Sequence, residues 1–164
     1  MSRWRPPPPK SSPYVTAKGF AALQEELRAL WERRNDVVKH LAAAAAEGDR
    51  SENAEYIYRK KELRELDRRI GYLQRRLPAL KVVTQAPADP DRVYFGATVA
   101  LEAEDGTLSA YRIVGPDETN PEEGRISVDS PMARALLKRA VDEEVVLRTG
   151  AATSRYVIID IRYD

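Results

Sequence analysis

The sequence predicts an α+β protein in two parts, a long antiparallel helical hairpin followed by a small domain of strands and one helix. Apolar residues recur every three or four positions along two stretches of similar length, which is the period of a helix. From Val93 onward the period changes to two, which is the period of a strand. The chain of 164 residues is long enough for one or two small domains of this kind.

The first part, residues 14–83, has the pattern of a coiled-coil hairpin. Thr16 can cap the first helix. The apolar stripe of that helix consists of Phe20, Leu23, Leu27, Leu30, Val37 and Leu41, and the second stripe of Tyr56, Leu63, Leu66, Ile70, Leu73, Leu77 and Leu80. Folding the two stripes antiparallel places their large apolar residues opposite one another, with Arg34 and Arg59 at the remaining seam positions. Each arm should extend roughly 45 Å, and the alanines at 42–46 should keep the far end slender.

The second part begins after a proline-containing linker at residues 84–92. Strands are expected at 94–101, 108–114, 126–128, 144–148 and 156–161. Asp105-Gly106 is a turn signal, and Ser130-Pro131 should open a helix that runs through Arg139. We therefore expect residues 93–164 to form a mostly antiparallel α+β domain of their own. The proline-rich residues 1–13 are expected to be a disordered arm.

Composition excludes several classes of site. The chain has no cysteine and one histidine, His40, which leaves no disulfide, no thiolate metal site and little material for a zinc centre or a catalytic triad. A net charge of +1 indicates no particular partner. No apolar run is long enough for a membrane span, and the start lacks the apolar core of a secretory signal. We expect a cytoplasmic protein.

An acidic segment at 47–55 joins the two helical stripes. It places four carboxylates around Gly48, and two of them, Asp49 and Glu52, stand three residues apart. That spacing is also typical of a helix-capping box, so capping and an exposed acidic site are both open. Carboxylate oxygens suit Mg²⁺, but two exposed carboxylates are too few to hold it alone. They could complete a site whose other ligands come from a partner.

A basic stretch follows the acidic segment. Between Arg59 and Arg76 there are eight basic residues and three acidic ones. The stretch could be a solvated face with ion pairs to acids of the first helix, or a stripe that binds a phosphate backbone. The candidates for contact with a nucleic acid or a protein partner are Arg50, Ser51, Arg59, Lys60, Lys61, Arg64 and Arg68.

Several separated motifs resemble one known family. They are GDRSENAEY, RKKELRELDRRIGYL, YFGATV, YRIVGPDE and SPMARALLK. In this order they are similar to the bacterial transcript cleavage factors of the GreA/GreB family, nearer to the GreB branch. The resemblance implies a hairpin that enters the secondary channel of bacterial RNA polymerase, and an FKBP-like fold for residues 93–164 that docks on the polymerase.

The resemblance also implies a function for the acidic segment. The two essential acids of the family map onto Asp49 and Glu52, which would hold a Mg²⁺ ion jointly with the polymerase and promote cleavage of RNA whose 3' end has backtracked. The chain would then be a monomer that is not a stand-alone enzyme and needs no organic cofactor. Two alternatives are an inhibitor that binds the channel without cleavage, and an FKBP-like binding or chaperone module. The proline-rich arm is not part of the family pattern.

Overall fold

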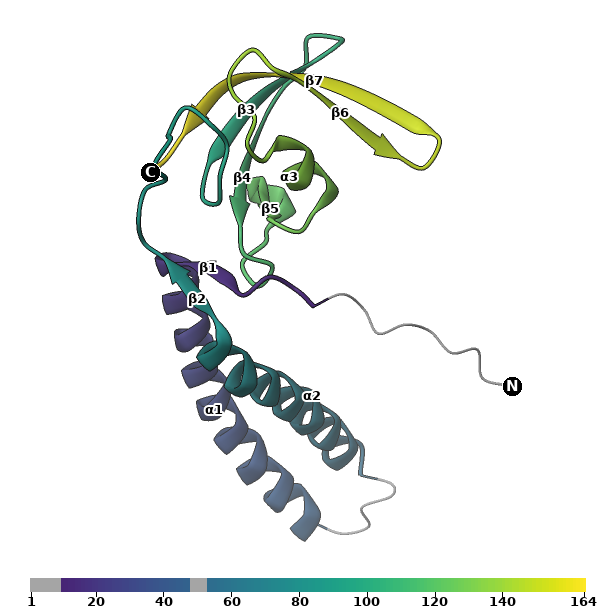
Figure 1. Cartoon of the computed structure of the whole chain (residues 1–164). Helices are drawn as coiled ribbons and strands as arrows, with labels where there is room; N and C mark the ends of the chain where they lie inside the picture. Colours follow the sequence, from purple (N-terminus) through teal and green to yellow (C-terminus); the bar gives the residue numbers. More distant parts are fainter. Residues whose placement is uncertain (1–9, 48–52) are drawn as a thin grey trace, which may run out of the picture. The chain divides into compact units, whose positions relative to one another are not determined.

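The computed structural model describes residues 10–47 and 53–164 and divides the chain into two compact units (Figure 1). The hairpin unit is Phe20–Leu80, and the sheet unit combines Met1–Gly19 with Lys81–Asp164. The sheet unit is therefore built from both ends of the chain.

Two antiparallel helices form the hairpin unit. Helix α1 spans Ala17–Ala46, so its first three residues belong to the sheet unit, and helix α2 spans Ala54–Arg76 and ends in a 3₁₀ turn, η1, at Leu77–Ala79. Figure 1 shows the two helices side by side. The buried side chains of the helices fall on the predicted seam and are Leu23, Val37, Ala44, Ile70 and Leu73. Burying this stripe is what holds two otherwise polar helices together.

Ion pairs among the described residues join α1 to α2 along the edges of the seam. Arg69 binds Glu26 through two hydrogen bonds of 2.8 and 2.9 Å, and Arg34 Nε lies 2.6 Å from Asp67. The third pair is Arg33 with Glu62, at 2.7 Å from Nε. The Arg69–Glu26 pair shows that part of the basic stretch serves the hairpin itself, as one of the two interpretations of the sequence expected, whereas the other two pairs join arginines of α1 to acids of α2.

Glu62 is the most enclosed acid of these pairs, with 18% of its side chain exposed. It also accepts a hydrogen bond of 3.1 Å from Arg59 on its own helix. Burial opposes ionisation of Glu62, but the hydrogen bonds from Arg33 and Arg59 outweigh burial, so the pKa of Glu62 lies below its ordinary value of 4.5. Glu62 is therefore ionised at neutral pH and links both helices.

The sheet unit contains a five-stranded sheet with strand order β5-β4-β3-β7-β6. Its strands are β3 (Thr98–Ala103), β4 (Leu108–Val114), β5 (Arg125–Ser127), β6 (Glu144–Thr149) and β7 (Ala152–Arg162). The β4–β5 pair is parallel and the other pairs are antiparallel. The core of the unit includes Val99, Leu101, Ile113 and Ile158 from the sheet, together with Leu136 from the short helix α3 (Pro131–Leu136).

The predicted turns and caps of this unit are confirmed. Asp105 accepts a hydrogen bond from the N–H of Thr107 in the turn between β3 and β4, and this bond lowers the pKa of Asp105. Ser130 caps α3 by accepting from the N–H of Ala133, with Pro131 at the first helical position. A 3₁₀ turn, η2, at Pro121–Glu123 precedes β5.

Several element boundaries differ from those expected: the last strand, for example, begins at Ala152 rather than at 156, and two other differences have a local cause. The first strand begins at Thr98 rather than at 94, because Gly96 adopts a positive φ of 88° in a turn where Ala97 N–H bonds to Tyr94 C=O. Helix α3 ends at Leu136 rather than at Arg139. Residues 137–139 leave the helix because Lys138 has a φ of 70° and donates its N–H to Val93 C=O at 2.7 Å.

A second, two-stranded sheet was not expected from the sequence. Strand β1 (Tyr14–Thr16) pairs in parallel with β2 (Lys81–Val83), and the C=O of Pro13 accepts from the N–H of Lys81 at 2.8 Å. The expected disordered arm, 1–13, lies mostly outside the described residues. Its described end has a defined partner, because the N–H of Ser12 donates to Asp129 at 2.8 Å.

We expect Glu62→Gln to lower the stability of the hairpin by about 1 kcal/mol at neutral pH, because it weakens bonds to two arginines. A lowered pKa means that the contribution of Glu62 is present above pH 4.5 and is lost as the pH falls through the pKa of the folded state. The stability difference between the wild type and the variant should therefore shrink below pH 4.5. Thermal unfolding followed by helical circular dichroism at several pH values measures it.

The control is Glu65→Gln, which removes the charge of an exposed glutamate on the same helix that has no ion pair within the described part of the chain. That variant should match the wild type within a few tenths of a kcal/mol at each pH. A Glu62→Gln deficit that stays constant between pH 7 and pH 3 would contradict the assignment.

Candidate functional site

The candidate site is the acidic segment between α1 and α2. Asp49, Arg50, Ser51 and Glu52 lie outside the described residues. The structure therefore describes only the residues on either side of them. On one side α1 ends at Ala46, and the N–H of Glu47 still bonds to the C=O of Ala44 at 3.3 Å. On the other side α2 begins at Ala54.

Asn53 is the N-cap of α2. Its side-chain oxygen accepts a hydrogen bond of 3.1 Å from the N–H of Tyr56, and its backbone has the extended conformation of a cap, with φ −83° and ψ 101°. A capping box with Asp49 as the cap and Glu52 at the third helical position would need the helix to begin four residues earlier. Asn53 performs the capping that the spacing of the two acids had left open.

The same side chain ties the two helices together. The amide nitrogen of Asn53 donates to the C=O of Ala44 at 2.9 Å, and Ala44 is 4% exposed. A short side chain can reach a carbonyl on the facing helix only where the two backbones are close, as the alanines at 42–46 predict. Asn53 thus closes the end of the hairpin at a point four residues beyond Asp49 and one beyond Glu52.

Arg59 differs from the other predicted contact residues. Only 19% of its side chain is exposed, and it bonds to Glu62 at 3.1 Å and lies 3.8 Å from Glu55. Its Nε is buried without a hydrogen-bond partner. Arg59 therefore belongs to the charged edge of the seam in the free chain.

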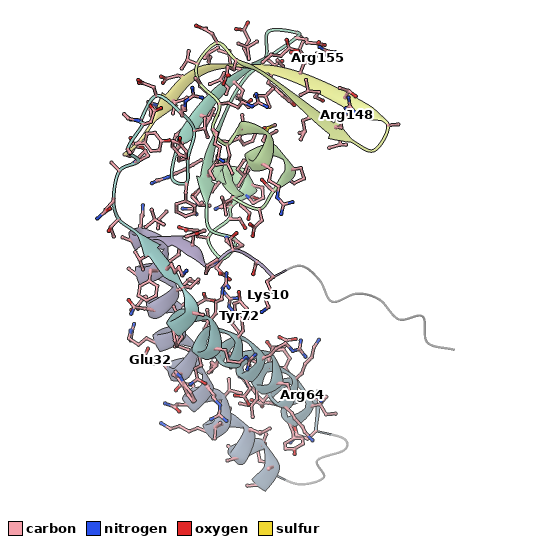
Figure 2. All side chains as sticks on the ribbon, in the orientation of Figure 1. Lys10, Glu32, Arg64, Tyr72, Arg148 and Arg155 are labelled. Carbon is pink, nitrogen blue, oxygen red and sulfur yellow. The ribbon has the colours of Figure 1, made fainter. Side chains whose placement is uncertain are left out.

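The remaining basic candidates face solvent. Lys60, Lys61, Arg64 and Arg68 are exposed on α2. Lys60 lies 5.9 Å from the ring of Tyr56, whereas Lys61, Arg64 and Arg68 have no ion pair within residues 10–47 and 53–164. Figure 2 shows Arg64 on α2 and Glu32 on α1 at the outer sides of the hairpin. We name Lys61, Arg64 and Arg68 the basic shaft.

Two exposed side chains beside the acidic segment were not singled out from the sequence. Ile57 is 53% exposed and Tyr58 is 62% exposed, and the guanidinium of Arg59 lies 5.6 Å from the ring of Tyr58. They could have been recognised from the sequence as apolar residues that follow the cap of α2 but do not belong to its apolar stripe. Tyr56, by contrast, is partly buried, in agreement with a packing role.

The described residues offer few other sites. Within residues 10–47 and 53–164, no group of three or more histidine or acidic side chains could hold a metal ion. A cavity of about 450 Å³ in the sheet unit is lined by the aromatic residues Phe95 and Tyr163. Its lining also contains the charged residues Lys18, Arg112 and Asp164, so it is not a purely apolar pocket. Neither of the two long helices, over their described residues, has the apolar length of a membrane span.

Comparisons with known proteins cover nearly the whole chain. The model described as "Transcription elongation factor, N-terminal" matches residues 13–82, and "Transcription elongation factor, GreA/GreB, C-term" matches residues 87–163. A protein of Xanthomonas axonopodis pv. citri named transcription elongation factor GreB is 57% identical over 99% of this chain and 98% of its own length. The chain belongs to the GreA/GreB family of transcription elongation factors.

A second relative in this family agrees. The GreB of Pseudomonas aeruginosa is 53% identical over 99% of this chain and 98% of its own length. Among solved structures, GreA factor homolog 1 of Thermus thermophilus is 24% identical and covers 91% of this chain and 97% of its own, with a TM-score of 0.43. A structural likeness at this level says nothing about activity. The family resemblance that the motifs had indicated is confirmed by the two sequence relatives.

Within this family member, Asn53 has two separable bonds, and two substitutions distinguish them. Asn53→Asp keeps an acceptor for the N–H of Tyr56 but removes the donor to Ala44, whereas Asn53→Ala removes both. We expect Asn53→Ala to destabilise the start of α2 by about 1–2 kcal/mol and Asn53→Asp by less. Amide hydrogen exchange at Tyr56 measures the cap directly, and it should accelerate only in Asn53→Ala. Equal acceleration in both variants would contradict the assigned roles.

Proposed function

We propose that this chain enters the secondary channel of bacterial RNA polymerase and stimulates the polymerase's own Mg²⁺-dependent cleavage of backtracked RNA, which rescues arrested complexes. The observation that carries the proposal is that Asn53 caps α2 and closes the hairpin, so that Asp49 and Glu52 are not needed as caps. The names of the relatives, transcription elongation factor GreB, support the same conclusion.

The slender end of the hairpin supports delivery into a narrow opening. Near the turn α1 contributes the buried Ala44 and the partly buried Ala45 to the seam, and Asn53 joins the helices there through a hydrogen bond to the C=O of Ala44. Helix α1 has 30 residues, which corresponds to about 45 Å of reach. A long, thin, rigid rod is the shape that can carry two carboxylates into a channel.

The carboxylate oxygens of Asp49 and Glu52 fit Mg²⁺, which prefers oxygen ligands, and two such groups are too few to hold the ion without a partner. We assign both residues as ligands of a Mg²⁺ ion that the polymerase holds jointly with the chain. When bound, that ion supplies an activated water and stabilises charge on the cleaved phosphodiester. The chain contributes the two acids and their position, so it is not a stand-alone enzyme and the reaction takes place in the polymerase.

The basic shaft suits the nascent RNA or the channel wall. Lys61, Arg64 and Arg68 are exposed on α2 and have no ion pair within the described ranges. Arginine and lysine side chains of this kind bind phosphate groups without reading sequence. Arg50 and Ser51 are assigned as secondary contacts beside the two acids, and the 93–164 region as the part that docks on the polymerase.

The decisive experiment uses a polymerase complex that is stalled and backtracked, with RNA length followed over time. The wild-type chain should shorten the RNA from its 3' end. The double variant Asp49→Asn, Glu52→Gln keeps the size and polarity of both side chains but removes the anionic ligands. We expect it to bind the polymerase within about twofold of the wild type and to lose about a hundredfold or more in stimulated cleavage.

A matched control removes the same charge from the same segment. Glu47→Gln with Glu55→Gln should retain cleavage within severalfold, because these acids are not assigned to the ion. Binding without any RNA shortening by the wild type would make the chain a channel-binding inhibitor, and no binding would favour a separate FKBP-like binding module. Normal cleavage by the Asp49, Glu52 double variant would overturn the assignment of the two acids.

For the basic shaft, we expect Arg64→Gln with Arg68→Gln to weaken binding to the backtracked complex and to flatten its dependence on salt. Each lost phosphate contact should reduce the slope of log affinity against log salt concentration by about one. Binding titrations between 50 and 300 mM salt, roughly the range in which such slopes are resolved, measure the effect.

The control for the basic shaft is Arg28→Gln on α1, since Arg28 already pairs with Glu25 and Glu32 on its own helix. It should leave the salt slope unchanged. If Arg64→Gln with Arg68→Gln also leaves the slope unchanged, the basic shaft is a solvated face and makes no contact.

A further inference from the structure

The carboxylate of Glu118 lies against the first turn of α1, within the sheet unit. It accepts hydrogen bonds from the N–H of Thr16 at 2.7 Å, from the hydroxyl of Thr16 at 2.5 Å and from the N–H of Gly115 at 3.0 Å. Thr16 and Glu118 are separated by 102 residues in the sequence. A carboxylate that accepts three hydrogen bonds, two of them from the cap of a helix, is a strong and specific anchor.

Thr16 connects Glu118 to the first turn of α1. Its hydroxyl oxygen accepts from the N–H of Gly19 at 3.0 Å, which is the bond of an N-cap, while the same hydroxyl donates to Glu118. The negative charge of Glu118 also lies near the positive end of the helix dipole. Figure 1 shows β1 leading directly into α1 at this point. Glu118 therefore holds both the last residue of β1 and the first turn of α1.

Two glycines make the close approach possible. A Cβ at Gly19 would lie 2.1 Å from a carboxylate oxygen of Glu118. A Cβ at Gly115 would lie 2.0 Å from the C=O of Tyr14 and 3.0 Å from the other carboxylate oxygen. Gly19 stands in the first turn of a helix, where alanine would be intrinsically better. Its presence is explained by the space that the Glu118 carboxylate occupies.

The bonds to Glu118 are not needed to cap α1, because the hydroxyl of Thr16 alone could do so. The additional bonds connect the start of α1 to the loop after β4, which is about a hundred residues later in the sequence. Helix α1 continues without interruption for 30 residues to the acidic segment, about 45 Å away. At that length, a tilt of about 5° at the start moves the far end by about 4 Å, whereas ligands must be held to about 0.5 Å.

We propose that Glu118 is a positioning residue for the acidic segment: it anchors the first turn of α1 so that Asp49 and Glu52 are presented in one position. The inference rests on the proposed function. It adds Glu118, which is far from Asp49 and Glu52 in the sequence, to the residues on which stimulated cleavage depends. Loss of the anchor should reduce the fraction of bound chains whose acids reach the ion. The maximal rate of cleavage should therefore fall, while the affinity for the polymerase changes little.

The test compares cleavage at saturating chain with binding affinity for Glu118→Ala and Glu118→Gln. Glu118→Ala should lower the maximal rate at least fivefold, change affinity less than twofold and accelerate amide exchange at Thr16 and Gly115. Glu118→Gln retains one acceptor oxygen and should recover part of the rate. The control Glu122→Gln removes an exposed charge from the neighbouring 3₁₀ turn and should change none of these values.

Gly19→Ala provides a second test that does not weaken the helix. It should displace Glu118 by steric contact and lower the maximal rate although alanine favours helix formation. Gly71→Ala in α2, where a Cβ would lie 3.3 Å from the flexible end of Arg75, is the matched control and should leave the rate unchanged. Because both substitutions break one anchor, Gly19→Ala with Glu118→Ala should be no worse than either alone.

The outcomes separate this inference from the proposed function. If the Asp49, Glu52 double variant loses cleavage while Glu118→Ala and Gly19→Ala retain the wild-type maximal rate, the proposed function stands and the positioning role is wrong. A Glu118→Ala effect confined to amide exchange, or to affinity, would also overturn the role. Normal cleavage by the Asp49, Glu52 double variant would remove the proposed function on which the inference rests.

Discussion

The close approach of α1 and α2 at the end of the hairpin fixes the residues on both sides of the acidic segment. The small side chain of Ala44, which is buried near the turn, lets Asn53 reach the C=O of Ala44 while it caps α2. This one side chain satisfies a free helical N–H and joins the two backbones. The two acids proposed to bind the ion therefore belong to a short segment whose ends are both anchored.

Charge is divided along the hairpin in a way that follows from the same seam. Arginines beside the seam pair with acids of the facing helix, as in Arg69 with Glu26 and Arg33 with Glu62. Basic residues of α2 that point away from the seam are left exposed. The division gives α2 a structural edge and a face that is available for binding, although both come from one basic stretch of sequence.

The sequence was sufficient for features that depend on local patterns. Helical periodicity predicted the buried residues of the seam, and the caps Thr16 and Ser130 follow from residue type alone. It was not sufficient where the partner is distant. The β1–β2 pair joins three-residue strands far apart in the chain, and Glu118 meets Thr16 across 102 residues. Helix α3 ends early for a similar reason, because Lys138 bonds to Val93, which no local pattern reveals.

In the function that we propose, the chain supplies carboxylate ligands to a Mg²⁺ ion that the polymerase binds weakly by itself. The rate of RNA cleavage by a backtracked polymerase, measured against Mg²⁺ concentration with and without saturating chain, tests it most directly. The account predicts that the half-saturating Mg²⁺ concentration falls severalfold when the wild-type chain is present, and that the Asp49→Asn, Glu52→Gln variant does not lower it. A chain that accelerates cleavage with an unchanged Mg²⁺ requirement would contradict the account.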